Sequence, residues 1–202
     1  MTPPPESPLA CLWSTRCRRS AAFCTCGRRR PAGAALTQRF LKPGEIIVCQ
    51  TPGEVVTVLG PCVAVTLFHV PSGLAAMCHA MLPEPADGAR LPADDPQRWK
   101  YVVDAVPEML RIFAAGGARA SEVEVKLFGG AQLLLGAGCG RADDGVGAAN
   151  ARLARELIAA AGYAIRATDV GGPVGRKLVF DTRSGVVRVK RLTARAREPV
   201  LA

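Results

Sequence analysis

The sequence predicts a single α/β domain of the layered α+β kind, in which a mixed β-sheet packs against two or more helices. Three observations favour this fold class. Hydrophobic residues make up 49% of the 202 residues, so the chain can bury a sizeable core. Short β-branched runs bounded by Gly and Pro alternate with longer segments of helical spacing. The chain contains no run of 18 apolar residues, so we expect no membrane insertion.

The charge distribution divides the chain into three expected parts: a basic extension over 1–38, a folded domain over 39–194 and a short tail over 195–202. Of the first 39 residues, seven are Arg and one, Glu6, is acidic. A second basic cluster lies near the C-terminus. Because these Arg residues lie mainly near the chain ends and lack interleaved aromatics, solvated ends are the simpler interpretation, and we expect no nucleic-acid partner. An Arg-rich, acid-poor start also resembles an organelle transit peptide.

Strands are expected first in the folded part. Each run is rich in β-branched residues and bounded by turn residues such as Pro52-Gly53 and Gly60-Pro61. The runs are 45–50, 54–59, 62–68 and 74–82, with a loop at 69–73.

Two helices and more strands follow. The segment 97–115 has apolar residues at helical spacing, and Pro107 is expected to kink the helix or mark its restart. The segment 150–161 is Ala- and Leu-rich and ends at Gly162. Further strands are expected at 122–128 and 163–169, followed by a hairpin of 177–181 with 186–192.

The eight cysteines have irregular spacing, and residues 1–30 contain no apolar signal-peptide core. Reduced thiols in a cytoplasmic protein are therefore expected rather than disulfides. Cys17, Cys24 and Cys26 could suggest zinc, but no second CxxC pair and no nearby His complete four ligands, so we expect no metal.

The candidate chemistry is a Cys–His pair. The chain has two histidines, His69 and His79. If the loop between the strands 62–68 and 74–82 is His69–Ser72, then Cys62 lies directly across from His79 on the same face. A register change of one residue would separate them. His69 is expected in the loop, and Cys78 on the opposite face.

Such a pair supports nucleophilic attack on a carbonyl carbon, because an imidazole can take the thiol proton. Backbone N–H groups near the Gly60-Pro61 break could bind the oxyanion. The residues alone leave plainer interpretations open: Cys62 as a small buried hydrophobe and His79 as a satisfied core histidine.

Several segments together resemble the CheD family of chemoreceptor glutamine deamidases. The stretch VLGPCVAVTLF (58–68) resembles its LGSCVAV segment, and GLAAMCHAMLP (73–83) resembles its G-x-x-x-M-A-H-x-M-L-P. KLFGGA (126–131) is similar to its K-[IL]-x-G-G-[AS] turn. DVGGPVGRK (169–177), with FD (180–181) and GVV (185–187), is similar to its ending. The resemblance covers residues 40–192.

The resemblance implies that Cys62 is the nucleophile and His79 its general base. It also implies a threonine, for which Thr57 is the candidate, although in the family this residue often stands where the chain has Val56. Pro61 replaces the usual Ser and removes an N–H near the nucleophile. The glycine pairs at 129–130 and 171–172 are expected to serve backbone conformation.

The implied activity is conversion of glutamine side chains of methyl-accepting chemotaxis receptors to glutamate in the cytoplasm, without a metal or organic cofactor. A CheC-type phosphatase is a second implied partner. The alternative is a weakly catalytic or non-catalytic adaptor that binds receptors or that phosphatase. Nucleic-acid binding through the Arg-rich ends and a thiol protease are further hypotheses that we rank lower.

Overall fold

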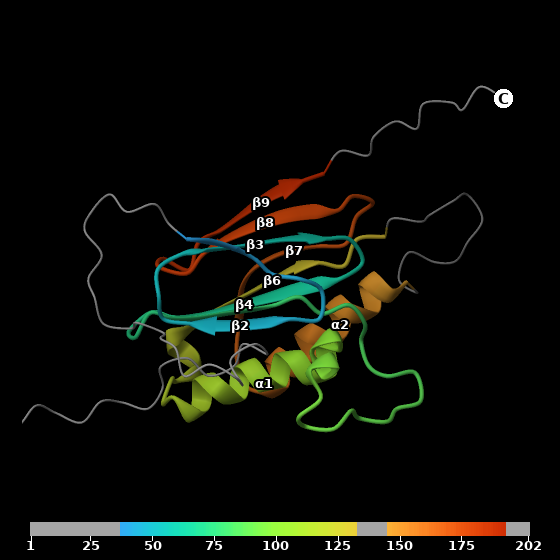
Figure 1. Cartoon of the computed structure of the whole chain (residues 1–202), viewed down its shortest axis with the longest axis horizontal. Coiled ribbons are helices and arrows are strands. Elements are labelled where there is room, and N and C mark those ends of the chain that lie inside the picture. The colour runs from blue at the N-terminus through green and yellow to red at the C-terminus, as the bar shows by residue number, and fades with distance from the viewer. Residues whose placement is uncertain (1–36, 133–144, 193–202) are drawn as a thin grey trace, which may run out of the picture.

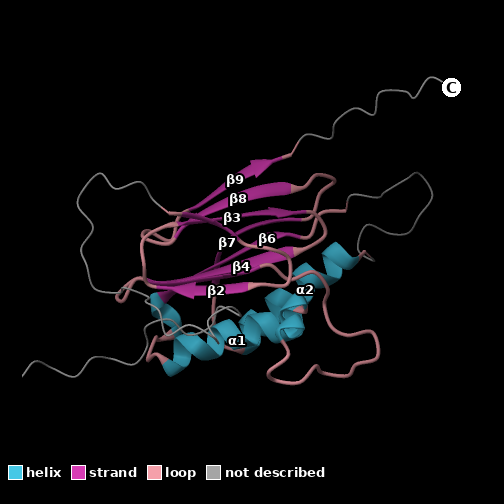
Figure 2. Cartoon of the chain, in the orientation of Figure 1, coloured by secondary structure: helices cyan, strands magenta, loops and turns pink. Residues whose placement is uncertain are grey.

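The structure is a computed structural model that describes residues 37–132 and 145–192, and these residues form three layers (Figures 1 and 2). Two helices make one outer layer, a five-stranded sheet lies in the middle, and a four-stranded sheet makes the other outer layer. The predicted α+β class is confirmed, with the strands divided between two mixed sheets. The expected extension and tail lie almost wholly outside the described residues, so the division into three parts stays a prediction.

Each sheet combines parallel and antiparallel neighbours. The middle sheet has the order β2 (Ile46–Cys49), β5 (Leu74–Cys78), β4 (Val63–His69), β6 (Val123–Gly129) and β7 (Ile165–Val170). The outer sheet has the order β1 (Gln38–Phe40), β3 (Glu54–Leu59), β8 (Arg176–Asp181) and β9 (Val187–Arg191). The helices are α1 (Val102–Ala115) and α2 (Val146–Ala160), with short 3₁₀ helices η1 (Pro96–Lys100) and η2 (Ala120–Glu122).

The predicted helix over 97–115 is two helices, and its break is not at Pro107. Tyr101 is extended, with φ −99° and ψ 133°, and separates η1 from α1. Pro107 lies inside α1 and lacks the N–H that would bond to the carbonyl of Val103. That carbonyl accepts a hydrogen bond from Arg90 Nη1 at 3.1 Å instead. The helix continues past the proline, and the Arg90 side chain donates to the carbonyl that the proline leaves without its usual partner.

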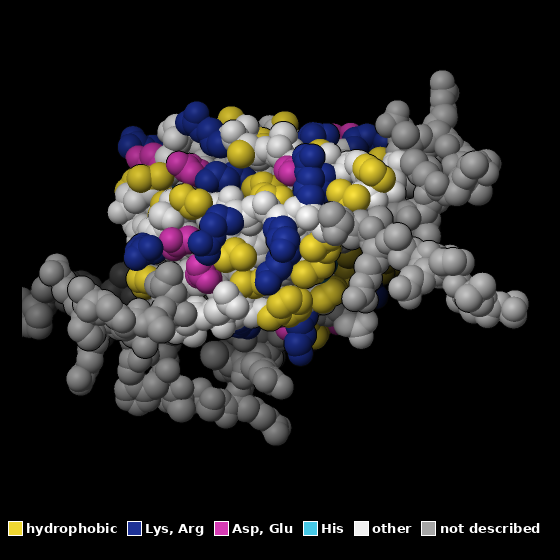
Figure 3. All heavy atoms as spheres, turned by 90° about the horizontal axis from the view of Figure 1, so that it is seen from above, with side chains coloured by type: hydrophobic (Ala, Val, Ile, Leu, Met, Phe, Trp, Pro, Cys, Tyr) yellow, Lys and Arg dark blue, Asp and Glu magenta, His cyan; other side chains and the backbone are white. Residues whose placement is uncertain are grey.

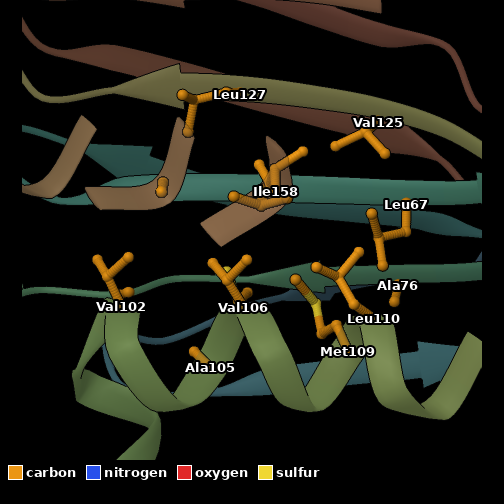
Figure 4. Packing of buried hydrophobic residues seen from close by; sticks show 14 of the residues in the cluster. Leu67, Ala76, Val102, Ala105, Val106, Met109, Leu110, Val125, Leu127 and Ile158 are labelled. Atoms are coloured by element: carbon orange, nitrogen blue, oxygen red, sulfur yellow. The ribbon is translucent and has the colours of Figure 1, made fainter. Parts of the chain in front are cut away.

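Two hydrophobic cores separate the layers. Strand residues alternate between them, because successive side chains point to opposite faces. The core between helices and middle sheet includes Val102 and Val106 of α1, which point toward the sheet that carries Leu67 and Val125 (Figure 4). The core between the sheets is lined by Val55, Leu59, Ala64, Phe68, Ala75, Met77, Leu178 and Phe180.

The β4–β5 register differs by two residues from the predicted one. Thr66 pairs with Met77, and an isolated bridge joins Val63 to Ala80, so position 62 lies across from position 81. The last pair is His69 with Leu74, which leaves a loop of 70–73 instead of 69–72. The prediction that Cys62 and His79 lie directly opposite each other was therefore wrong. Because an offset of two keeps every side chain on its face, the shared face survives, and the two residues are diagonal neighbours.

The outer face of the four-stranded sheet mixes cationic and apolar side chains (Figure 3). Several cations are paired: Arg188 bonds to Glu54, and Arg183 lies 3.3 Å from Asp181. In the part of the chain that the structure describes, no helix is long and apolar enough to cross a membrane.

Candidate active site

The candidate site lies between the two sheets, at the end where β4 begins and β5 finishes. Cys62 precedes β4, and its partly buried side chain packs on the core between the sheets. His79 follows β5 and turns to the same space, where it meets Thr57 of β3. The site therefore combines the thiol and imidazole of the middle sheet with a hydroxyl of the outer sheet.

His79 is fixed by its backbone and by its ring. Its N–H donates to the carbonyl of Glu45 at 3.0 Å, and its carbonyl accepts from the N–H of Gly44 at 2.8 Å. The residue is 1% exposed, and its Nδ1 lies 2.8 Å from Oγ1 of Thr57. Two backbone bonds and one side-chain bond thus hold the imidazole in one orientation.

The Thr57 hydroxyl determines which ring nitrogen of His79 carries the proton. Its single proton goes to the carbonyl of Leu41, which Oγ1 approaches at 2.8 Å. Oγ1 must therefore accept at its other contact, so Nδ1 of His79 is the donor. In the neutral ring the unprotonated nitrogen is then Nε2, which is buried and has no partner among the described residues. The network leaves His79 with a free lone pair suited to accept a proton.

The backbone around Cys62 is held on the β6 side. Gly130 N–H donates to the Cys62 carbonyl at 2.8 Å, and Ala131 N–H donates to that of Gly60 at 2.9 Å. Gly129 has φ 104°, and a Cβ there would lie 2.2 Å from the Cys62 carbonyl oxygen. Only glycine allows β6 to approach so closely, which supports the conformational role predicted for Gly129 and Gly130.

Burial keeps the Cys62 thiol and the His79 imidazole neutral near pH 7. It lowers the pKa of His79 from 6.5 to about 4, because a charged ring would lose its water; the Leu41 carbonyl and Glu45 oppose this shift. Burial raises the pKa of the Cys62 thiol, while the backbone N–H of Cys62 opposes that shift. At rest the site therefore holds a thiol and a neutral imidazole, not a thiolate and an imidazolium.

The strand pattern places Thr57, and not position 56, in the site. Thr57 shares the inner face of β3 with Val55 and Leu59, and it is 0% exposed. Val56 lies on the other face of the strand. Because side chains alternate along β3, Thr57 faces His79 and Val56 does not.

The other predicted residues fall outside the site. His69 is the last residue of β4 rather than a loop residue, and its ring contacts Ser72 Oγ at 2.7 Å and Glu122 Oε2 at 3.4 Å. Cys78 lies on the opposite face of the strand, as predicted, where it packs in the core on the helix side, and burial raises its pKa to about 11.

No metal cluster is present in the described part of the chain. Within 37–132 and 145–192, no three His, Cys, Asp or Glu side chains gather as metal ligands. Cys17, Cys24 and Cys26, which were considered as zinc ligands from the sequence, lie outside these residues.

Two residues near the site were not identified from the sequence. The carbonyl of Leu41 has no side-chain signal at all. The sequence predicts Asn150 as the first residue of a helix, whereas it lies inside α2 and is 0% exposed. Its Nδ2 donates to the carbonyls of Pro61 at 3.0 Å and Met81 at 2.9 Å. Asn150 precedes Ala154 and Ile158 by four and eight residues, so an amide on the apolar stripe of the helix is the sequence signal that could have revealed it.

Comparisons with known proteins agree on one family. The family model described as CheD chemotactic sensory transduction matches residues 81–191. A protein of Geobacter sulfurreducens named "Probable chemoreceptor glutamine deamidase CheD 2" is 46% identical over 153 residues, which cover 76% of this chain and 89% of the relative. A protein of Oleidesulfovibrio alaskensis named "Probable chemoreceptor glutamine deamidase CheD" is 41% identical over 169 residues, or 83% of this chain and 78% of that one.

A third relative and a solved structure are also similar to parts of this chain. The protein with the same name from Maridesulfovibrio salexigens is 40% identical over 157 residues, which cover 76% of this chain and 91% of the relative. The crystal structure of Bacillus licheniformis hypothetical protein YfiH aligns with 61% of this chain and 49% of its own, at a TM-score of 0.42 and 11% identity, which is too low to indicate a shared fold. The family match and the length of the matches with relatives show that this chain belongs to the CheD family.

Proposed function

We propose that this chain is a protein-glutamine deamidase that converts glutamine side chains of chemoreceptors to glutamate, with Cys62 as nucleophile, His79 as general base and Thr57 as the residue that orients the base. The observation that carries the proposal is the Thr57–His79 hydrogen bond, which leaves Nε2 of His79 unprotonated and without a partner among the described residues. The names of the relatives supply the substrate class.

The first half of the reaction forms a thioester. His79 Nε2 takes the Cys62 proton as Sγ attacks the carboxamide carbon of the glutamine. The N–H of Cys62 donates to no carbonyl in the described structure and is a candidate donor to the oxyanion. His79 then gives its proton to the leaving nitrogen, and ammonia departs.

The second half hydrolyses the thioester. His79, neutral again, takes a proton from water as the water oxygen attacks the thioester carbon. The C–S bond breaks, the sulfur regains its proton, and a glutamate side chain is released. Because the pKa of His79 is lowered to about 4, the ring is neutral at the start of each half of the reaction and can accept a proton.

A reducing compartment suits this chemistry, because the nucleophile must be a free thiol. Cys62 and Cys78 are free thiols in the part of the chain that the structure describes, which supports the cytoplasmic location predicted from the sequence. The CheC-type phosphatase stays a predicted partner, and co-purification of the two proteins would test it.

The experiment is incubation of the protein with a chemoreceptor fragment, followed by measurement of ammonia release and of glutamine-to-glutamate conversion by mass spectrometry. We expect turnover with the wild type and none with Cys62→Ala. Cys78→Ala is the matched control and should retain turnover. It also removes a thiol, but one that packs in the core on the helix side and not between the two sheets. Equal turnover by Cys62→Ala and the wild type would overturn the proposal, whereas receptor binding without conversion by the wild type would favour the adaptor function.

A further inference from the structure

The side chain of Asn150 extends from helix α2 to the segments that carry the candidate site. Its amide nitrogen donates to the carbonyls of Pro61 and Met81. Pro61 directly precedes the thiol-bearing residue, and Met81 stands two residues after His79. One side chain thus joins the two segments that carry the nucleophile and the base.

The two bonds fill a fork where β4 and β5 separate. The last direct backbone bonds between these segments join Val63 and Ala80, each N–H to the other's carbonyl, at 2.9 Å. Beyond this pair, the N–H groups of Met81 and Leu82 both turn to the carbonyl of Lys100, at 2.7 and 3.0 Å. The carbonyls of Pro61 and Met81 would lack donors there, and the Asn150 amide supplies both.

The orientation of the Asn150 amide follows from its neighbours. Both contacts are carbonyl oxygens, which accept only, so the NH₂ group must face them. Oδ1 is buried and has no partner among the described residues. An unpartnered buried acceptor is costly, and its presence indicates that the two donated bonds outweigh this cost.

The bond to Pro61 also sets the direction of the Cys62 N–H. The Pro61–Cys62 peptide is trans, since no described peptide bond is cis. In a trans peptide the C=O and N–H point in opposite directions. With the carbonyl held by Asn150, the Cys62 N–H points away from that amide.

We propose that Asn150 is a positioning residue of the deamidation site: by holding the Pro61 and Met81 carbonyls, it fixes the Pro61–Cys62 peptide and sets the separation of the Cys62 thiol from His79. The inference rests on the proposed function for its effect on turnover. Its effect on the reactivity of the Cys62 thiol is independent of that function.

The test compares three variants with the wild type. Asn150→Asp keeps the shape but sets carboxylate oxygens against two carbonyls, Asn150→Leu removes both donors, and Asn150→Ser keeps one donor in a smaller side chain. Ile158→Val, a buried change in the same helix that lies away from Cys62, is the matched control for lost stability. Urea unfolding measures that loss in each protein.

Two readouts separate positioning from mere stability. One is the rate of iodoacetamide alkylation at Cys62 against pH, followed by mass spectrometry of its peptide. The other is kcat and KM for glutamine conversion. For Asn150→Asp and Asn150→Leu we expect kcat to fall at least tenfold with little change in KM, and the pH profile of Cys62 alkylation to shift. Asn150→Ser should give an intermediate effect, and Ile158→Val should keep both wild-type profiles.

Wild-type alkylation and kcat in the folded Asn150 variants would overturn the proposal, as would losses equal to those of Ile158→Val at equal stability. If Asn150→Asp and Asn150→Leu do not fold, Asn150→Ser decides by the same criteria. If the wild type itself shows no turnover but the Asn150 variants shift the alkylation profile of Cys62, the positioning role is supported. Only the deamidase function is then contradicted.

Discussion

At the scale of single residues, the site depends on the number of protons that one hydroxyl carries. Thr57 donates to Leu41 and must accept from His79, so the protonation of the ring follows from a residue outside the reacting pair. The sequence could indicate Cys62 and His79 from their shared face. It could not decide between positions 56 and 57 until the alternation of β3 was known, because the inward face of a strand depends on its neighbours.

Loss of the Thr57 hydroxyl is expected to reduce kcat while leaving KM almost unchanged. Thr57→Val has nearly the same shape but no hydroxyl, so the ring can adopt either neutral form and lose its orientation. We expect a fall of about tenfold or more, while removal of the base itself costs about a hundredfold or more. Thr57→Ser is the control that keeps the hydroxyl. Steady-state kinetics would contradict this role if Thr57→Val matched the wild type.

The pH dependence of kcat/KM follows from the two shifts in pKa. Because the pKa of His79 is lowered to about 4, the ring is neutral and able to accept a proton at any pH well above that value. Activity should therefore fall only as the pH drops toward 4. Because the pKa of Cys62 is raised, the thiol stays protonated through neutral pH. We expect a plateau from about pH 5.5 through neutrality. An acid limb near pH 6.5, the ordinary pKa of histidine, would show that the ring is not desolvated as described.

At the scale of elements, turn residues made some boundaries predictable. Strand β3 occupies the predicted 54–59 because Pro52-Gly53 and Gly60-Pro61 bound it on both sides. Strand β1 has three exposed residues and no pattern of its own, so nothing in the sequence indicated it. Helix α2 begins at Val146 after Gly145, which makes no side-chain cap, and the predicted start at Asn150 was four residues late.

The approach of β6 to β4 predicts a position-specific cost for glycine replacement. In Gly129→Ala, the new methyl group would meet the Cys62 carbonyl at 2.2 Å in addition to the strain of a positive φ. Gly171→Ala is the matched control, since Gly171 has φ 75° and no atom lies within 4 Å of the place its methyl group would take. We expect a loss of about 1–2 kcal/mol for Gly171→Ala and clearly more for Gly129→Ala. Equal free energies of unfolding in urea would contradict the close approach.

At the scale of the whole molecule, an ion pair joins the two sheets near the site. Arg176 of β8 donates from Nε to Oδ1 of Asp169 of β7 at 2.9 Å and from Nη2 to the carbonyl of Gly171 at 2.6 Å. Arg191 of β9 also bonds to Asp169, at 3.2 Å. The Arg176 side chain is 3% exposed and that of Arg191 is 68% exposed. Two arginines thus share one acceptor at very different depths.

Replacement of the two arginines by Gln should therefore destabilise the protein unequally. Arg176→Gln removes the buried partner of Asp169 and leaves carbonyls without donors, so we expect a loss of about 2–4 kcal/mol. Arg191→Gln removes a solvated contact, for which about 1 kcal/mol or less is expected. Urea unfolding at neutral pH measures both. A loss for Arg191→Gln as large as that for Arg176→Gln would show that the depth of the pair is irrelevant.

The Thr57–His79 hydrogen bond joins residues of two different sheets, and this has a consequence for engineering. The distance between hydroxyl and ring depends on the thickness of the apolar layer that Met77 and Phe180 help to fill. Substitutions chosen for thermostability, such as larger side chains in that layer, would spread the sheets and lengthen the bond. A more heat-resistant version of this protein is thus expected to work more slowly unless its added packing is confined to the helical side.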